Sequence, residues 1–211
     1  MVDFNLYLIT DRTQTAGREL PAVVAAALRG GVRAVQLREK DLPDYDLLEL
    51  ARTVRALTRQ FSARLFVNSH VEIALAVKAD GVHLGAGSRP VAEVRCLLGP
   101  DRLIGYSAHG VDEALCAEVD GADFVTFGPV YHTPSKAGYG APLGLGRLAE
   151  TARALAIPVF ALGGVCAESI DDLKAAGAAG IALISAIIAA PDPQREAKTL
   201  IDAMGHHVIT P

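Results

Sequence analysis

The sequence predicts a single (β/α)8 barrel, the TIM-barrel class, formed by one domain over residues 1–211. Short β-branched runs alternate with Ala- and Leu-rich helical stretches, and this alternation occurs eight times within a length that suits the closed barrel. Hydrophobic residues make up 51% and charged residues 21%, which suits parallel strands covered by helices. A doubly wound open sheet is the main alternative. It usually carries a glycine-rich first turn, whereas the first turn here is Thr10-Asp11-Arg12.

The expected strands are short apolar runs bounded by polar or turn-forming residues. In chain order they are Leu6 to Thr10, Ala34 to Leu37, Arg64 to Asn68, Gly81 to Leu84, Leu103 to Ser107, Phe124 to Gly128, Pro158 to Leu162 and Gly180 to Ile184.

Helical periodicity fills the segments between the strands. It predicts helices over Leu20 to Leu28, Tyr45 to Thr58, Val71 to Val77, Ala92 to Leu98, Glu113 to Glu118, Leu145 to Leu155 and Ile170 to Ala176, and a short one over Ala186 to Ala189. The second, fourth, sixth and eighth strands follow turns that contain Gly or Ala-Asp. Glycine there suits the left-handed residue that ends a helix.

Composition excludes several classes of protein. A net charge of −4 leaves no basic face for nucleic acid. The apolar stretch before Thr10 is too short for a signal peptide or a membrane span. Cys96, Cys116 and Cys166 show no disulfide or zinc spacing. They fit a reducing cytoplasm, and each is expected to be a small buried hydrophobe.

In a barrel the chemistry lies where the strands end, and the second expected strand ends in a basic cluster. Alternation sends Gln36, Arg38 and Lys40 to one side and Leu37 to the other. Arg38 and Lys40 could be solvated loop charges. However, a polar Gln36 inside an apolar strand needs a partner, which favours a binding role. Arg and Lys together suit a phosphate or diphosphate.

Two other strand ends carry weaker signals. Asn68 suits a ring edge or a phosphate oxygen, although Asn68 or Ser69 could equally cap the helix expected near Val71. After the fifth strand, Ser107 or His109 could face the barrel mouth, but a lone histidine is more often structural or simply exposed.

Further anion signals follow the sixth, seventh and eighth strands, and those after the seventh and eighth are the strongest. The irregular stretch Pro129 to Gly144 is long enough to suggest function, and its two hydroxyls and a lysine would suit an anion clamp: Thr133, Ser135 and Lys136. Gly163-Gly164 and Ser185 follow the last two strands, where barrels commonly bind phosphate through backbone N–H groups. A glycine pair needed only for packing is the alternative.

Taken together, these segments resemble one family across nearly the whole chain. The chain resembles thiamine-phosphate synthase and its relative, the TenI-type thiazole tautomerase. The matching segments are Tyr7 to Asp11, Gln36 to Lys40, Asn68, Gly81 to Gly85, Gly128 to Val130, Thr133 to Lys136, Gly163-Gly164 and Ile184 to Ile187.

The resemblance implies a (β/α)8 barrel, often a homodimer, in thiamine biosynthesis. The implied reaction is a transfer that joins an aminopyrimidine methyl diphosphate to a thiazole phosphate and releases diphosphate, with magnesium. It implies that the pyrimidine diphosphate is held by Gln36, Arg38, Lys40, Asn68 and Lys136, with Ser107 near the pyrimidine. It implies that the thiazole phosphate is held by Thr133, Ser135, Gly164, Ile184 and Ser185.

The chain departs from both family patterns. The synthase has two magnesium-binding aspartates where this chain has Ser69 and Ser88, so the resemblance implies magnesium while these two residues argue against it. The tautomerase has a catalytic histidine where this chain has Pro129, and His132 is the nearest substitute. Three hypotheses follow: a synthase, a metal-independent tautomerase, or a non-catalytic thiazole-phosphate or thiamine-phosphate binding protein.

Overall fold

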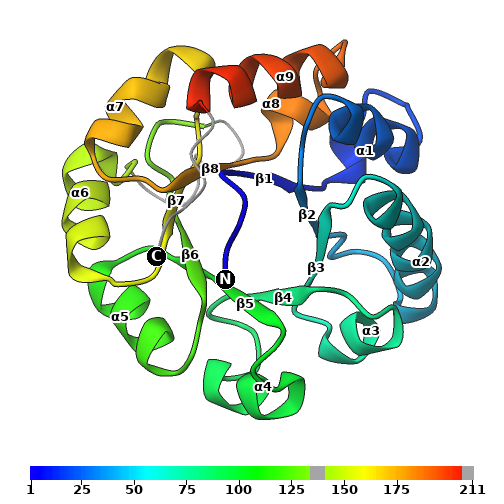
Figure 1. The fold of residues 1–211 in the computed structure, drawn as a ribbon, viewed down its shortest axis with the longest axis horizontal. Coiled ribbons are helices and arrows are strands. Elements are labelled where there is room, and N and C mark those ends of the chain that lie inside the picture. The colour runs from blue at the N-terminus through cyan, green and yellow to red at the C-terminus, as the bar shows by residue number, and fades with distance from the viewer. Residues whose placement is uncertain (134–140, 206–211) are drawn as a thin grey trace.

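The computed structural model describes residues 1–133 and 141–205, in which eight parallel strands close into one barrel (Figure 1). Each strand pairs with the next along the chain, and β8 pairs with β1, so the predicted fold is confirmed. The strands are β1 Leu6–Ile9, β2 Ala34–Leu37, β3 Arg64–Asn68, β4 Gly81–Leu84, β5 Leu103–Ala108, β6 Phe124–Phe127, β7 Val159–Leu162 and β8 Gly180–Leu183.

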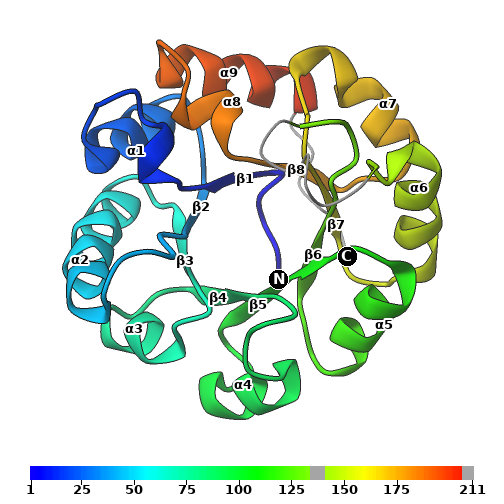
Figure 2. The same ribbon diagram turned by 180° about the vertical axis from the view of Figure 1, so that it is seen from behind.

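The helices form a ring around the barrel, which both end-on views show (Figures 1 and 2). They are α1 Leu20–Arg29, α2 Asp44–Gln60, α3 Val71–Ala76, α4 Val91–Leu98, α5 Val111–Val119, α6 Gly144–Ala154, α7 Ile170–Ala175, α8 Ser185–Ile188 and α9 Pro193–Met204, with 3-10 turns at Arg12–Gln14 and Ala167–Ser169. In the two described ranges no helix is long and apolar enough to cross a bilayer. Every predicted helix is present. The sequence analysis did not predict α9, which packs against α1.

The inside of the barrel is filled by a cluster of aromatic rings that meet mostly edge to face. The cluster consists of Phe4, Tyr7, Phe66, Phe124 and Phe160, and the centroids of its contacting rings are 5.3–6.4 Å apart. The segment that carries Phe4 runs through the middle of the ring of strands (Figure 2). Because these rings fill the interior, open space for a ligand lies at the carboxyl ends of the strands.

Glycines on three strands make room for these rings. A Cβ added to Gly81, Gly105 or Gly180 would overlap the ring of Phe66, Phe124 or Phe160 respectively. Large and small residues therefore alternate across the barrel interior so that its layers interlock.

The three cysteines correct the expectation of buried thiols. Cys96, Cys116 and Cys166 are all exposed and unpaired. In α4 the buried face is formed by Val91, Val94 and Leu98, and Cys96 lies off that face. The helical periodicity, rather than the usual burial of cysteine, determines which residues of this helix face the core.

Candidate active site

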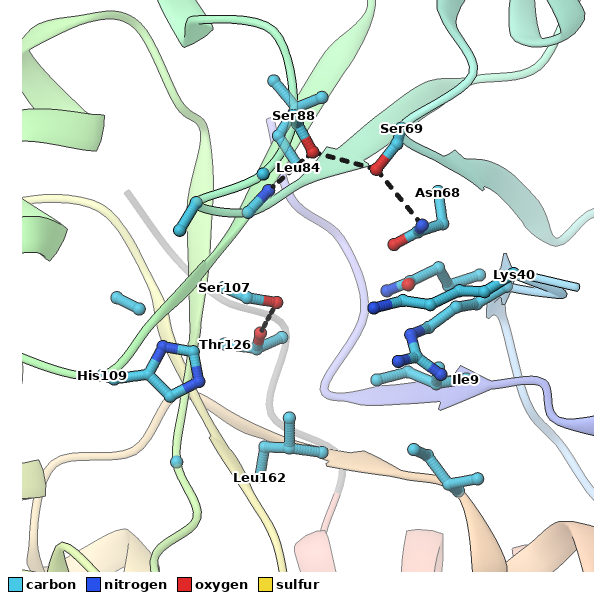
Figure 3. Close-up of a pocket in the computed structure, with 18 residues that line it drawn as sticks. Ile9, Lys40, Asn68, Ser69, Leu84, Ser88, Ser107, His109, Thr126 and Leu162 are labelled. Carbon is cyan, nitrogen blue, oxygen red and sulfur yellow. Dashed lines mark hydrogen bonds between the residues drawn. The ribbon is translucent and has the colours of Figure 1, made fainter. Parts of the chain in front are cut away.

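Two adjoining pockets open at the carboxyl ends of the strands. The first, here called the basic pocket, has a volume of about 310 Å³, and its polar side chains include Gln36, Arg38, Lys40, Asn68, Ser69, Ser88, Ser107, His109 and Thr126 (Figure 3). The second, here called the glycine pocket, has a volume of about 260 Å³ and is lined by His132, Thr133, Gly163, Gly164, Ser185 and their neighbours. Leu162 and Ile184 line both pockets, so two ligands bound there would lie side by side.

Nearly all of the predicted site residues that the structure describes therefore fall into these two pockets. Ser135 and Lys136 lie outside the described residues. Thr126 and Ile9 also line the basic pocket, although they were not predicted as site residues. Ser107 and His109, the two alternatives at the end of the fifth strand, both line it.

The loop after β2 is anchored by a buried glutamate. Glu39 accepts hydrogen bonds from the Thr10 hydroxyl (2.6 Å) and from the Arg12 backbone N–H (2.9 Å). The Arg38 N–H donates to the same Thr10 hydroxyl at 2.9 Å. Because Glu39 points away from the ligand space and is held there, its neighbours Arg38 and Lys40 turn into the basic pocket, as the alternation predicts.

The two cations of this loop repel each other. The positive charge of Arg38 lowers the pKa of Lys40, and the partial burial of Lys40 lowers it further. Among the residues that the structure describes, neither cationic group has a hydrogen-bond or ion-pair partner. The negative charge nearest in effect to Arg38 is Asp11, which acts at longer range and is already hydrogen-bonded to Thr13 and Gln14. An anion in the basic pocket would relieve this repulsion.

A chain of hydrogen bonds links the barrel interior to the basic pocket. Gln36 Nε2 donates to the Tyr7 hydroxyl (3.3 Å), which confirms that Gln36 has a polar partner. The Tyr7 hydroxyl lies 3.4 Å from His83 Nδ1, and His83 Nε2 lies 2.9 Å from the Ser107 hydroxyl. Ser107 in turn lies 3.2 Å from the Thr126 hydroxyl (Figure 3).

This series of hydrogen bonds favours one tautomer of His83. Tyr7 accepts from Gln36, and among the described residues His83 Nδ1 is the acceptor within reach of its buried proton, so we assign the Tyr7 hydroxyl as the donor to Nδ1. The remaining proton of the ring is then on Nε2 and is donated to Ser107. Burial raises the pKa of Tyr7 well above its usual value and lowers the pKa of His83 to about 3. With this lowered pKa His83 is neutral and a weak base, and its hydrogen bond positions the Ser107 hydroxyl at the basic pocket.

The three polar residues opposite the cations bond to one another. Asn68 Nδ2 donates to Ser69 Oγ at 3.2 Å, Ser69 Oγ lies 2.9 Å from Ser88 Oγ, and Gly85 N–H donates to Ser88 Oγ at 3.1 Å (Figure 3). The alternative role for Asn68 or Ser69, as a cap of α3, is wrong. The cap position is His70, and no side chain caps the helix.

These serines do not resemble a magnesium site. Magnesium requires hard, anionic oxygen ligands, and the two hydroxyls are neutral. None of the described residues that line the basic pocket is Asp or Glu. Residues 1–133 and 141–205 also contain no group of three His, Cys, Asp or Glu side chains that could hold a metal ion. The donor set at Ser69 and Ser88 therefore does not fit a protein-held magnesium ion.

The glycine pocket presents unpaired backbone donors. Within the described residues, the N–H groups of Gly164 and Ser185 have no acceptor, and both residues line this pocket. The glycine pair also lies against the loop after β6, where Val130 N–H donates to Leu162 O and Tyr131 N–H donates to Gly163 O. The two interpretations of the glycine pair, anion binding and close packing, are therefore compatible.

The sequence matches a family model described as thiamine monophosphate synthase over residues 6–187. The chain belongs to this family. It is 62% identical over 200 residues to the "Putative thiamine-phosphate synthase" of Geobacter sulfurreducens, covering 95% of this chain and 94% of that protein. It is 44% identical over 197 residues to the thiamine-phosphate synthase of Roseiflexus castenholzii, covering 93% and 86%. The solved structure of thiamine phosphate pyrophosphorylase from Pyrococcus furiosus matches with a TM-score of 0.85 and 36% identity, covering 95% of both chains.

Membership in the thiamine monophosphate synthase family confirms the resemblance drawn from the sequence. In this chain Ser69 and Ser88 stand where the resemblance implies aspartates.

His83 is expected to make the stability of the protein depend on pH. Its pKa is about 3 when folded and close to its usual 6.5 when unfolded, so below pH 6.5 the unfolded chain binds more protons. The free energy of unfolding should therefore fall as pH drops from 6.5 toward 3, by up to about 1.4 kcal/mol per pH unit.

The measurement is urea unfolding of the wild type and of His83→Gln at several pH values from 4.5 to 7. The amide can still donate to Ser107 but does not titrate. The stability advantage of the wild type should shrink as the pH falls. Parallel curves for the two proteins would show that His83 is not the group responsible.

Proposed function

We propose that this protein joins an aminopyrimidine methyl diphosphate to a thiazole phosphate, with release of diphosphate. The observation that carries the proposal is the pair of adjoining pockets, which share Leu162 and Ile184. Among the described residues, one pocket has two unpaired cations and the other has unpaired backbone donors. A reaction between two phosphorylated heterocycles needs two anion sites next to each other. The relatives named as thiamine-phosphate synthases support the same reaction.

In this reaction the bond between the methylene carbon and the diphosphate oxygen breaks, and the thiazole takes the place of the diphosphate. The departing group gains negative charge. Arg38 and Lys40 lie where they would stabilise that charge. Lys136 would add a third cation on the basis of the resemblance. Gln36, Asn68 and Ser107 supply amide and hydroxyl groups for the edge of the pyrimidine ring.

The thiazole phosphate is assigned to the glycine pocket. The Gly164 and Ser185 N–H groups would bind its phosphate beside Thr133, which lines the same pocket. Ser135 would add a further donor on the basis of the resemblance. Ile184 and Leu162 would contact both rings and hold them in van der Waals contact. We further propose that the protein works in the reducing cytoplasm, where three exposed, unpaired cysteines would persist as thiols.

The test is to incubate the purified full chain with both substrates, with magnesium and with a chelator, and to measure thiamine phosphate and diphosphate. Equal amounts of the two products are expected. Absence of product together with proton exchange on the thiazole would favour a tautomerase that uses His132, which lines the glycine pocket. Tight binding without either reaction would favour a non-catalytic binding protein.

A further inference from the structure

Each proton and lone pair of the Ser69 and Ser88 hydroxyls can be assigned to a hydrogen bond or shown to be left over. Each hydroxyl has one proton and two lone pairs. Ser69 already accepts from Asn68, and Ser88 already accepts from the Gly85 N–H. The two oxygens are 2.9 Å apart, so one of the hydroxyls donates to the other.

Both directions of that bond lead to the same result. If Ser69 donates, Ser88 accepts two bonds and its own proton is left over. If Ser88 donates, Ser69 accepts two bonds and its own proton is left over. In either case one oxygen has both lone pairs engaged and a proton to give. Such a group can donate to an anion, whereas it could bind a cation only after losing a hydrogen bond.

The charge around the pair favours an anion as well. Arg38 and Lys40 line the same pocket, and none of the described side chains that line it is a carboxylate. Residues 134–140 and 206–211, which lie outside the part of the chain that the structure describes, contain neither Asp nor Glu. A divalent cation would meet two positive side chains and neutral oxygens, whereas phosphate oxygens would meet donors from both sides.

We propose that the basic pocket binds diphosphate oxygens directly, without a bridging divalent cation, and that the Ser69–Ser88 pair donates one hydroxyl to them. The identity of the ligand as a diphosphate rests on the proposed function. Direct binding and its independence of metal rest on the hydrogen bonds and charges of the pocket.

The first experiment is calorimetry of inorganic diphosphate binding to the full chain, in chelator and in magnesium. Binding in chelator is expected to be as tight as in magnesium or tighter, because magnesium competes for the free diphosphate. Binding that tightens roughly 10-fold or more with magnesium would overturn the proposal. A failed coupling assay leaves this measurement valid, so the two proposals fail separately.

The second experiment uses the count of protons. Ser69→Ala and Ser88→Ala each keep one hydroxyl that can donate, so each should weaken diphosphate binding in chelator by less than about 3-fold. The double variant has no hydroxyl left and should lose roughly 10-fold or more, as expected for a hydrogen bond to a charged group. Ser62→Ala, at an exposed serine, is the control. A double variant that binds as tightly as the wild type would contradict the assignment.

A third variant keeps the test informative if the alanine variants fold poorly. Ser88→Asp places a carboxylate beside the diphosphate, so binding in chelator should weaken by roughly 10-fold or more and should recover with magnesium. Unchanged binding in chelator would show that Ser88 is remote from the ligand and would overturn the proposal.

Discussion

Replacing Arg38 with alanine is expected to weaken the binding of inorganic diphosphate roughly 10- to 100-fold, which corresponds to about 1.5–3 kcal/mol for a lost charge-assisted hydrogen bond. Arg38 lines the basic pocket and, in the described part of the chain, its guanidinium has no hydrogen-bond or ion-pair partner, because only its backbone N–H is engaged, by Thr10. Its guanidinium can therefore give all of its donors to a ligand. A planar fork suits two neighbouring phosphate oxygens.

The loss should be larger for diphosphate than for monophosphate, because monophosphate can occupy the glycine pocket without contacting Arg38. Calorimetry with both ligands measures the difference. Arg38→Lys keeps the charge without the fork and should fall between the wild type and Arg38→Ala. Arg59→Ala removes the same charge from the exposed surface of α2 and serves as the control. Equal losses for the two ligands would show that Arg38 does not bind the diphosphate.

The strands were predictable because polar residues or glycines mark where each apolar run stops. The bounds predicted for β2, β3 and β4 agree with the structure. Three other predicted strands run one residue too far, at Thr10, Gly128 and Ile184. Each of these residues lies where the backbone leaves the sheet toward the ligand side. The type of residue alone does not predict at which position the backbone leaves the sheet.

The helix α9 could have been found from its first turn. Asp192 accepts from the Arg195 N–H, and Pro193 occupies the first helical position, which is a typical helix start. The last helix predicted from the sequence ends at Ala189, before this signal. Because α9 packs on α1, it completes the outer layer beside the first strand.

The basic loop was predictable from alternation alone, but the role of His83 was not. His83 and Ser107 are 24 positions apart, and their contact depends on the register of β4 against β5, which pairs His83 with Gly105. A Cβ at Gly105 would approach His83 Nδ1 to 2.5 Å, so the glycine leaves the space that the imidazole occupies. The pairing of Ser69 with Ser88 likewise depends on how the loop after β4 folds back.

Gly164→Ala is expected to destabilise the protein by about 2–5 kcal/mol. Gly164 has a φ of +66°, in the left-handed region, where a side chain costs about 1–2 kcal/mol. An added Cβ would also lie 2.6 Å from the His132 carbonyl oxygen and 2.7 Å from Tyr131 Cβ. One of these two atoms belongs to the backbone, so the added Cβ can be accommodated only if the loop after β6 moves. Overpacking of this kind costs about 1–3 kcal/mol.

Two control variants separate the causes of this loss. Gly17 also has a positive φ, of +79°, but an added Cβ there meets no atom within 4 Å, so Gly17→Ala should lose only the conformational part. Gly146 lies inside α6 and does not have a positive φ, and a Cβ added there, as at Gly17, would meet no atom within 4 Å. Gly146→Ala should therefore stabilise the protein by about 0.5–1 kcal/mol. Urea unfolding measures all three variants. Equal losses for Gly164→Ala and Gly17→Ala would mean that contact with the loop adds nothing. A larger loss at Gly164, together with weakened monophosphate binding, is the expected result, because the same contact shapes the wall of the glycine pocket.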